Sequence, residues 1–228
     1  MPEFEGYTRS AFQFLESLQT NNNREWFNEN KDDYESLIRE PTLDFIASMN
    51  QPLHDISAHF VVEPKKSGGS MMRPFRDTRF SKDKTPYKTN IGVQFRHASG
   101  KDIHAPGYYI HIDNTESFIG VGMWKPDSVA LRCIRESISD NFDQWLEITK
   151  LLEHSAYGFF GDSLKRIPKG FDKSDPAIEH LKRKSCLIIK PIHHQFLFSG
   201  NLISNVIEEI KRSTPFMQFI CRALDIKF

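Results

Sequence analysis

The densest group of side chains suited to binding chemistry lies in residues 73–88, RPFRDTRFSKDKTPYK, which we call the basic segment. Its charged residues are six bases, Arg73, Arg76, Arg79, Lys82, Lys84 and Lys88, and two acids, Asp77 and Asp83. Clustered cations repel one another, so a protein keeps them together where carboxylates, solvent or an anionic ligand offset the repulsion. The basic segment is therefore the first place to expect a site.

The leading hypothesis is a binding site for an anionic ligand that carries phosphate or carboxylate. A guanidinium group can contact two oxygens of such a ligand at once, whereas a lysine ammonium acts as a point charge. In this hypothesis the arginines grip the anion, Asp77 orients one of them, and Tyr87 gives a hydrogen bond or a stacking face. Phe80 could stack on a base or sugar in the same way. The predicted ligand-binding residues are Arg73, Arg76, Asp77, Arg79, Lys84, Tyr87 and Lys88.

Two alternatives use the same residues. The protein could be an enzyme that acts on a phosphorylated or nucleic-acid substrate at this site. It could also be a structural or interaction protein, in which an internal lattice of Arg–Asp pairs ties a loop to a sheet. The residue types leave open whether a reaction is catalysed.

The sequence gives weaker evidence for metal binding, cofactor binding or nucleophilic catalysis. His111 and Asp113 are two positions apart, so they share one face of a strand, and with His104 they would suit Zn²⁺ or Fe²⁺. The sequence has no H-x-x-x-H or H-x-E pattern, however, and we predict no metal site. It also has no nucleophile elbow and no phosphate-binding loop, so we expect no cofactor. Cys186 follows the basic run KRKS but begins an apolar stretch, which favours a buried thiol over a nucleophile.

Composition limits the class of protein. The chain has 228 residues, with 30 basic and 30 acidic side chains and a net charge of +0, which argues against DNA-packaging and membrane-surface proteins. Its three cysteines are widely spaced, as expected of buried thiols in a reducing compartment. No secretory signal is visible at the start, and no window approaches the roughly eighteen apolar residues of a membrane span. We expect a soluble, cytoplasmic protein whose partner is an anionic small molecule. Nucleic acid is a weaker alternative, no membrane is expected, and the oligomeric state stays open.

Hydrophobic periodicity predicts an α+β fold with a central, mainly antiparallel sheet and helices packed at the N- and C-terminal ends. Strands are predicted where apolar residues alternate, at 91–95, 109–112 and 118–121, and the short connections between them favour an antiparallel meander. Helices are predicted over 8–20, from the Asn21–Asn23 run to Pro41, from Pro41 to Met49, over 127–138, 145–152 and 175–181, and within 201–224. Short apolar runs at 60–62 and 186–189 suggest further strands. The length favours one domain, 1–228.

The Asn21–Asn23 run precedes a predicted helix and so offers it an N-cap. Free backbone N–H groups at the same helix start would also favour an anion, which is the alternative for this run.

The pattern R-x-x-R-D-x-R-F, followed by an Asp–Lys pair and a tyrosine, resembles the bacterial family catalogued as domain of unknown function 2461, which also occurs inside longer fungal proteins. The matching residues are Arg73, Arg76, Asp77, Arg79, Phe80, Asp83, Lys84 and Tyr87. Further similar stretches are NNNREWF (21–27), APGYYIHI (105–112), GVGMW (120–124) and IPKGFD (167–172). The resemblance covers nearly the whole chain. Because the family is uncharacterised, it implies no catalytic role and no fold detail.

Overall fold

A computed structural model describes residues 4–101 and 104–228. Within these residues the centre of the fold is a five-stranded antiparallel sheet with the strand order β1-β2-β3-β5-β4. The strands are β1 (Ile91–Arg96), β2 (Gly107–Ile112), β3 (Ser117–Met123), β4 (Gly158–Phe159) and β5 (Cys186–Ile192). The predicted α+β class and the antiparallel meander are confirmed.

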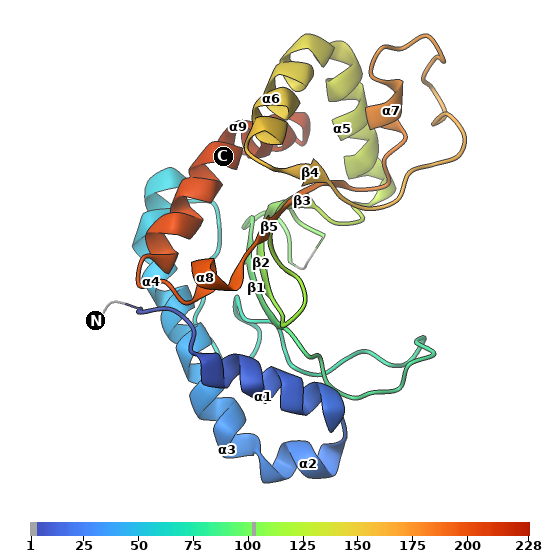
Figure 1. The fold of residues 1–228 in the computed structure, drawn as a ribbon. Helices are drawn as coiled ribbons and strands as arrows, with labels where there is room; N and C mark the ends of the chain where they lie inside the picture. Colours follow the sequence, from blue (N-terminus) through green and yellow to red (C-terminus); the bar gives the residue numbers. More distant parts are fainter. Residues whose placement is uncertain (1–3, 102–103) are drawn as a thin grey trace.

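Helices gather at both ends of the sheet and on one of its faces (Figure 1). They are α1 (Arg9–Thr20), α2 (Arg24–Glu29), α3 (Lys31–Asp33), the π-helix η1 (Tyr34–Arg39), α4 (Glu40–Ile56), α5 (Ser128–Asp140), α6 (Phe142–His154), α7 (Ile178–Leu181), α8 (His194–Leu197) and α9 (Leu202–Ala223). Helices α4 and α9 contact the sheet through β1 and β3, while α5, α6 and α7 lie at the opposite end of the molecule from α1, α2 and α3.

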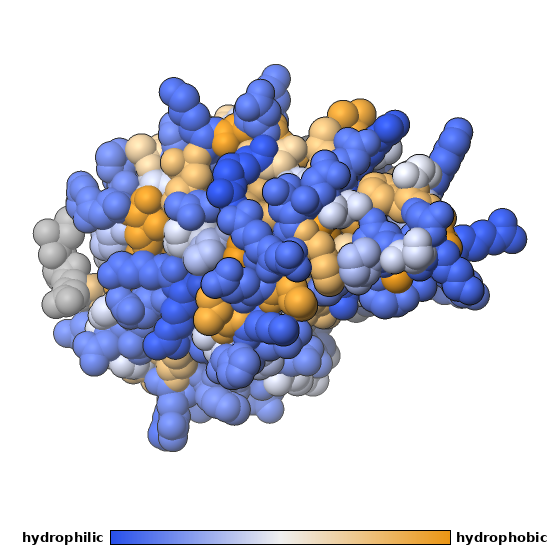
Figure 2. Space-filling view, turned by 90° about the horizontal axis from the view of Figure 1, so that it is seen from above, coloured by the Kyte–Doolittle hydropathy of each residue, from blue (hydrophilic) through white to orange (hydrophobic). Residues whose placement is uncertain are grey.

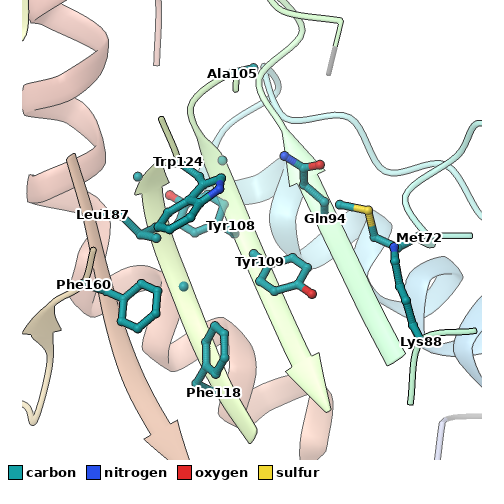
Figure 3. Close-up of a pocket in the computed structure, with 13 residues that line it drawn as sticks. Met72, Lys88, Gln94, Ala105, Tyr108, Tyr109, Phe118, Trp124, Phe160 and Leu187 are labelled. Carbon is teal, nitrogen blue, oxygen red and sulfur yellow. The ribbon is translucent and has the colours of Figure 1, made fainter. Parts of the chain in front are cut away.

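Alternation of side chains gives the sheet two different faces. In β1, Ile91, Val93 and Phe95 are buried on the face that α4 and α9 cover. The neighbouring positions in β1, such as Gln94, point to the other face, because successive side chains of a strand alternate. Helices lie behind the sheet when it is viewed from that second face (Figure 3). The second face is therefore the one that can accept a ligand.

Two of the predicted helices begin at side chains that cap them. The Thr8 hydroxyl accepts a hydrogen bond from the Ala11 N–H, and Asp127 accepts from the N–H groups of Val129 and Ala130. These side chains satisfy donors that the first turn of a helix leaves unpaired, so they mark where α1 and α5 begin.

The prediction at Pro41 was wrong in one respect. Pro41 was expected to end one helix and begin the next, but the chain stays helical from η1 into α4, with Pro41 in the first turn of α4. A proline has no N–H to donate and its ring presses on the carbonyl four residues earlier, at Leu37. A wider turn relieves both problems, and the π-helix that directly precedes Pro41 supplies it.

The sheet also differs in detail from its prediction. The run at 60–62 forms no strand and contributes only an isolated bridge between Phe60 and His97. The two-residue strand β4, which pairs with the edge of β5, was missed because a two-residue strand is too short to show alternation. The 201–224 tail is one helix, α9, that continues through Pro215.

Among the described residues, no helix combines the length and apolarity needed to cross a membrane. Seen from above, hydrophilic side chains cover most of the surface and hydrophobic ones lie in small groups between them (Figure 2). Cys186 and Cys221 are buried, as predicted, whereas Cys133 is half-buried. Burial raises the pKa of the Cys186 thiol to about 12, which is the opposite of what a nucleophile needs.

Candidate ligand pocket and the basic segment

The basic segment leaves the edge of the sheet as a two-stranded projection. Just before it, the Met72 N–H donates to the Gly92 carbonyl of β1 at 2.8 Å, which anchors this part of the chain to the sheet. The two halves of the segment then pair with each other: Arg76 N–H donates to the Pro86 carbonyl at 2.9 Å, and Lys88 N–H donates to Pro74 at 2.7 Å. Figure 1 shows the segment extending away from the helices and the sheet. Its far half therefore has few neighbours outside the segment.

Two predicted site residues, Asp77 and Arg79, pair with each other near the end of the projection. The Arg79 guanidinium donates from Nε and Nη2 to the two carboxylate oxygens of Asp77, at 2.9 and 2.7 Å. These hydrogen bonds hold the pKa of the Asp77 carboxyl well below its usual range. Both side chains are exposed, so the pair gains little stability in water.

Arg76 and Lys84 also have partners inside the segment. Arg76 donates to the Asp83 carboxylate and to the Thr85 hydroxyl. The Thr85 backbone N–H and then Arg76 lower the pKa of Asp83 to about 2. The Lys84 ammonium donates to the Thr78 carbonyl at 2.8 Å. These hydrogen bonds hold Arg76 and Lys84 against other groups of the same segment.

Tyr87 is fixed at the base of the projection. Its ring is buried and stacks on Phe27 of α2, with ring centroids 3.9 Å apart and an interplanar angle of 12°. The Asn22 amide donates to the Tyr87 carbonyl at 2.9 Å and accepts from the Tyr87 N–H at 3.0 Å. Asn23 caps α2 by accepting from the Trp26 N–H, so the capping prediction for this run is confirmed. Tyr87 joins the basic segment to the N-terminal helices.

Lys88 and Arg73 differ from Arg76, Arg79 and Lys84. Within residues 4–101 and 104–228, neither side chain makes a hydrogen bond or an ion pair. Burial, and then the nearby charge of Arg73, lower the pKa of Lys88. Because successive residues of an extended chain point to opposite sides, Tyr87 faces the helices while Lys88 faces the open side of the sheet.

Lys88 lies at the edge of a pocket of about 340 Å³ on that open face, which we call the sheet-face pocket (Figure 3). Its floor is low because three glycines, Gly107, Gly120 and Gly122, have no side chains there. Its lining also includes Met72, Lys88, Gln94, Ala105, Tyr108, Tyr109, Phe118, Trp124, Phe160 and Leu187. The volume and the mostly apolar lining are typical of small-molecule sites.

The strand register explains the floor. Gly120 pairs with Tyr109 across β2 and β3, and Gly122 pairs with Leu187 across β3 and β5. At Gly122 the φ angle is +124°, and a Cβ atom would lie 2.1 Å from the Cys186 carbonyl oxygen, so only glycine fits. At Gly120 a Cβ atom would meet only ordinary contacts, at 3.7 Å or more. The backbone thus demands glycine at Gly122, whereas at Gly120 the small residue serves to keep the pocket open.

Aromatic rings from three elements surround this floor. Trp124 and Phe160 have centroids 5.8 Å apart, Phe160 and Phe118 are 6.4 Å apart, and Phe118 and Tyr109 are 6.0 Å apart. Figure 3 shows these four side chains standing around the space above the strands. Such an arrangement offers faces and edges on which a flat ligand can pack.

Polar groups at the pocket are few. Besides Lys88, the Gln94 side chain lines it and makes no hydrogen bond to any described residue. The Tyr109 hydroxyl lies 3.1 Å from Nδ1 of His111, whose ring stacks on Phe118 with centroids 4.7 Å apart. Burial lowers the pKa of His111, so its imidazole is neutral near pH 7 and Nδ1 can accept a hydrogen bond from the Tyr109 hydroxyl. The pocket therefore presents one cation, one free amide and one hydroxyl.

A comparison with models of known protein families identifies the family of this chain. The family model described as Conserved hypothetical protein (DUF2461) matches residues 10–219. The chain belongs to this family. No curated protein and no solved structure matches it. The match extends over nearly all the described elements of this DUF2461 member, including the whole sheet, the basic segment and the sheet-face pocket.

The predicted site residues are thus divided between different places. Lys88 lines the sheet-face pocket and Arg73 lies close to it, whereas Arg76 and Tyr87 line a separate groove toward the N-terminal helices. Asp77, Arg79 and Lys84 lie in the exposed part of the segment. Among the described residues, no group of three or more His, Cys, Asp or Glu side chains is placed to hold a metal ion.

Sequence reasoning missed the aromatic lining of the pocket. One signal was present in GVGMW at 120–124, because alternation places Gly120, Gly122 and Trp124 on the same face of a strand. Two glycines followed by a large ring indicate a hollow with a wall. Phe160 gave no such signal, because it follows the very short strand β4.

Proposed function

We propose that the protein binds a flat, anionic small molecule in the sheet-face pocket, with the Lys88 ammonium as its counter-ion. The observation that carries this proposal is a lysine at the edge of a pocket lined by aromatic rings, with no carboxylate partner among the residues that the structure describes. The proposed ligand is an anion, as the sequence predicts. Of the basic segment, only the end that joins the sheet belongs to the proposed site.

The energetics favour a ligand that uses both features. Packing a flat ring system against Trp124, Phe160 or Tyr109 contributes about 0.5–1.5 kcal/mol per ring pair beyond the burial of apolar area. A hydrogen bond from an ammonium group to an anion contributes about 1.5–3 kcal/mol. In the free protein Lys88 and Arg73 repel each other, and a carboxylate or phosphate between them would remove that cost.

The experiment compares two probes of nearly the same size and shape, of which one is charged and the other neutral. 2-Naphthoate and 2-naphthamide have the same ring system, but only the first carries a negative charge. We expect naphthoate to quench the fluorescence of Trp124 and to bind about tenfold more tightly than naphthamide. A Trp124→Phe variant identifies the signal, since Trp26 and Trp145 lie outside the pocket lining.

Two variants of Lys88 test its role. Lys88→Met keeps the length of the side chain and removes the charge, so it should abolish the preference for naphthoate while leaving naphthamide binding unchanged. Lys88→Arg should retain the preference. Equal affinity of the wild-type protein for the two probes, or a preference that survives in Lys88→Met, would overturn the proposal.

One observation makes catalysis in the same pocket a second candidate function. The Tyr109 hydroxyl lines the pocket and lies 3.1 Å from Nδ1 of His111. Burial raises the pKa of Tyr109 to about 12, so the hydroxyl keeps its proton near pH 7 and can donate a hydrogen bond or a proton to a reacting group. A catalytic role predicts that Tyr109→Phe retains naphthoate binding but stops turnover of a reactive carboxylate substrate. A binding protein shows no turnover in either form, and mass spectrometry of the recovered ligands separates the two cases.

A further inference from the structure

The exposed end of the basic segment carries an aromatic ring that the fold does not use. Phe80 is 94% exposed, and the Arg79 guanidinium lies 5.7 Å from its ring centroid. Burying a phenylalanine side chain stabilises a fold, and the exposed Phe80 does not make that contribution. Lys82 beside it is exposed and makes no ion pair with any described residue. An exposed ring between cations is suited to contact with another molecule.

A second feature lies at the base of the same projection. A groove of about 580 Å³ runs between the basic segment and the N-terminal helices, and we call it the basic groove. Its cations are Arg24, Lys31, Arg39 and Arg76. Its aromatic residues are Phe27, Tyr34, Phe75 and Tyr87.

Two of these four cations are already paired, Arg39 with Glu35 and Arg76 with Asp83, and the other two are not paired with any described residue. Glu35 is the acidic residue among the described lining, and it already pairs with Arg39 and with Lys66. Arg24 and Lys31 form no ion pair within the described part of the chain. One wall of the groove is the π-helix η1, which supplies Tyr34, Glu35 and Arg39, and π-helical turns occur frequently at functional sites.

The two features are continuous. Arg76 and Thr78 line the basic groove and belong to the basic segment, so a path of cations leads from Arg24 through Arg76 to Arg79 and the Phe80 ring. A ligand that fits this path is a flexible chain with regularly spaced negative charges and flat rings. Phosphates would follow the cations, and a base would stack on Phe80, which is the way that sequence-tolerant proteins hold single strands.

We propose that the basic groove and the exposed end of the basic segment form a binding surface for single-stranded nucleic acid. A lipid surface fits less well, because four of the cations lie in a groove that a flat headgroup layer would not enter. The surface is separate from the sheet-face pocket, and neither proposal depends on the other. Because the whole chain has a net charge of +0, affinity rests on local contacts and should depend strongly on salt.

The experiment measures anisotropy of a labelled DNA or RNA oligonucleotide of about 20 nucleotides at several NaCl concentrations from about 25 to about 200 mM. About four phosphate contacts predict a slope of about −3 for log affinity against log salt. Phe80→Ala should weaken binding about tenfold by removing the stacked ring. Phe80→Trp should retain binding, with quenching of the new tryptophan as the base stacks on it.

The double variant Arg24→Ala with Lys31→Ala should reduce the salt slope by about 1.4, because each cation contributes about 0.7. The control is Lys150→Ala with Lys165→Ala, two exposed lysines far from the groove, which should leave the slope unchanged. All variants change exposed side chains, and thermal melting verifies that they fold. No binding at low salt, or binding that is indifferent to both Phe80→Ala and the groove variant, overturns the proposal. Phe80-dependent sedimentation with phosphatidylserine vesicles, without oligonucleotide binding, overturns it in favour of a membrane.

Discussion

The sheet-face pocket and the basic segment are neighbours that are built in different ways. The pocket is assembled from β1, β2, β3, β5 and the residue after β4, and strand register sets the position of its rings. The basic segment is held in shape mainly by hydrogen bonds within it, such as those from the Arg76 and Lys88 N–H groups to the Pro86 and Pro74 carbonyls. A conspicuous local motif can therefore stabilise its own shape, while a less visible set of distant residues forms the better enclosed site.

The largest effect is expected at the point where the two regions join. Tyr87→Ala removes the ring that stacks on Phe27, and truncating a buried aromatic side chain costs about 3–5 kcal/mol of unfolding free energy. Lys88 follows Tyr87 directly, so naphthoate binding should weaken as well. Urea denaturation and the naphthoate titration measure both. A loss of stability below about 1 kcal/mol would show that the segment is held without this contact.

The next largest effect is a difference in stability between substitutions of two glycines on the pocket floor. Gly122→Ala introduces a Cβ atom 2.1 Å from a carbonyl oxygen at a positive φ, and we expect it to destabilise the protein by about 2–4 kcal/mol. Gly120→Ala has room for its methyl group, so its stability should change by less than about 1 kcal/mol while naphthoate affinity falls. Comparable melting temperatures for the two variants would contradict the strand geometry described above.

A smaller effect is expected in the pH dependence of naphthoate binding, which tests the charge of Lys88. Burial lowers the Lys88 pKa below 10.5, and only the ammonium form attracts the anion, so affinity should fall as pH rises toward 10.5. In Lys88→Arg the affinity should stay constant over that interval, because a guanidinium keeps its proton. The folded protein loses this proton at a lower pH than the unfolded chain does. The contribution of Lys88 to the free energy of unfolding therefore rises over the same interval.

The smallest effect is expected at the exposed pair. Asp77→Asn removes the charge that Arg79 contacts, yet both groups are in water, so the melting temperature should not change measurably. Freed from its carboxylate, Arg79 should bind oligonucleotide slightly more tightly. A clear drop in melting temperature would favour the alternative in which the arginines are structural.

The sequence predicted the sheet and most helices because their signals are local. Ile91, Val93 and Phe95 alternate, Thr8 and Asp127 cap helices, and short turns join β1, β2 and β3. The pocket could not be predicted in the same way. Tyr109 and Phe118 lie on neighbouring strands of the meander, but Phe160 joins them only because β5, far away in sequence, pairs with both β3 and β4. A linear pattern contains no such register. The basic segment was easy to see, but whether its arginines bind one another or a ligand depends on distances that spacing does not give.

The π-helix before Pro41 also sets the orientation of everything that precedes it. Each residue of a helix turns the chain by about 100°, so deleting one residue from Tyr34–Arg39 would restore an ordinary helix but rotate α1 and α2 relative to α4. Asn22 and Phe27 would then swing away from Tyr87. A single extra residue in the backbone is thus what aligns α1 and α2 with the base of the projection.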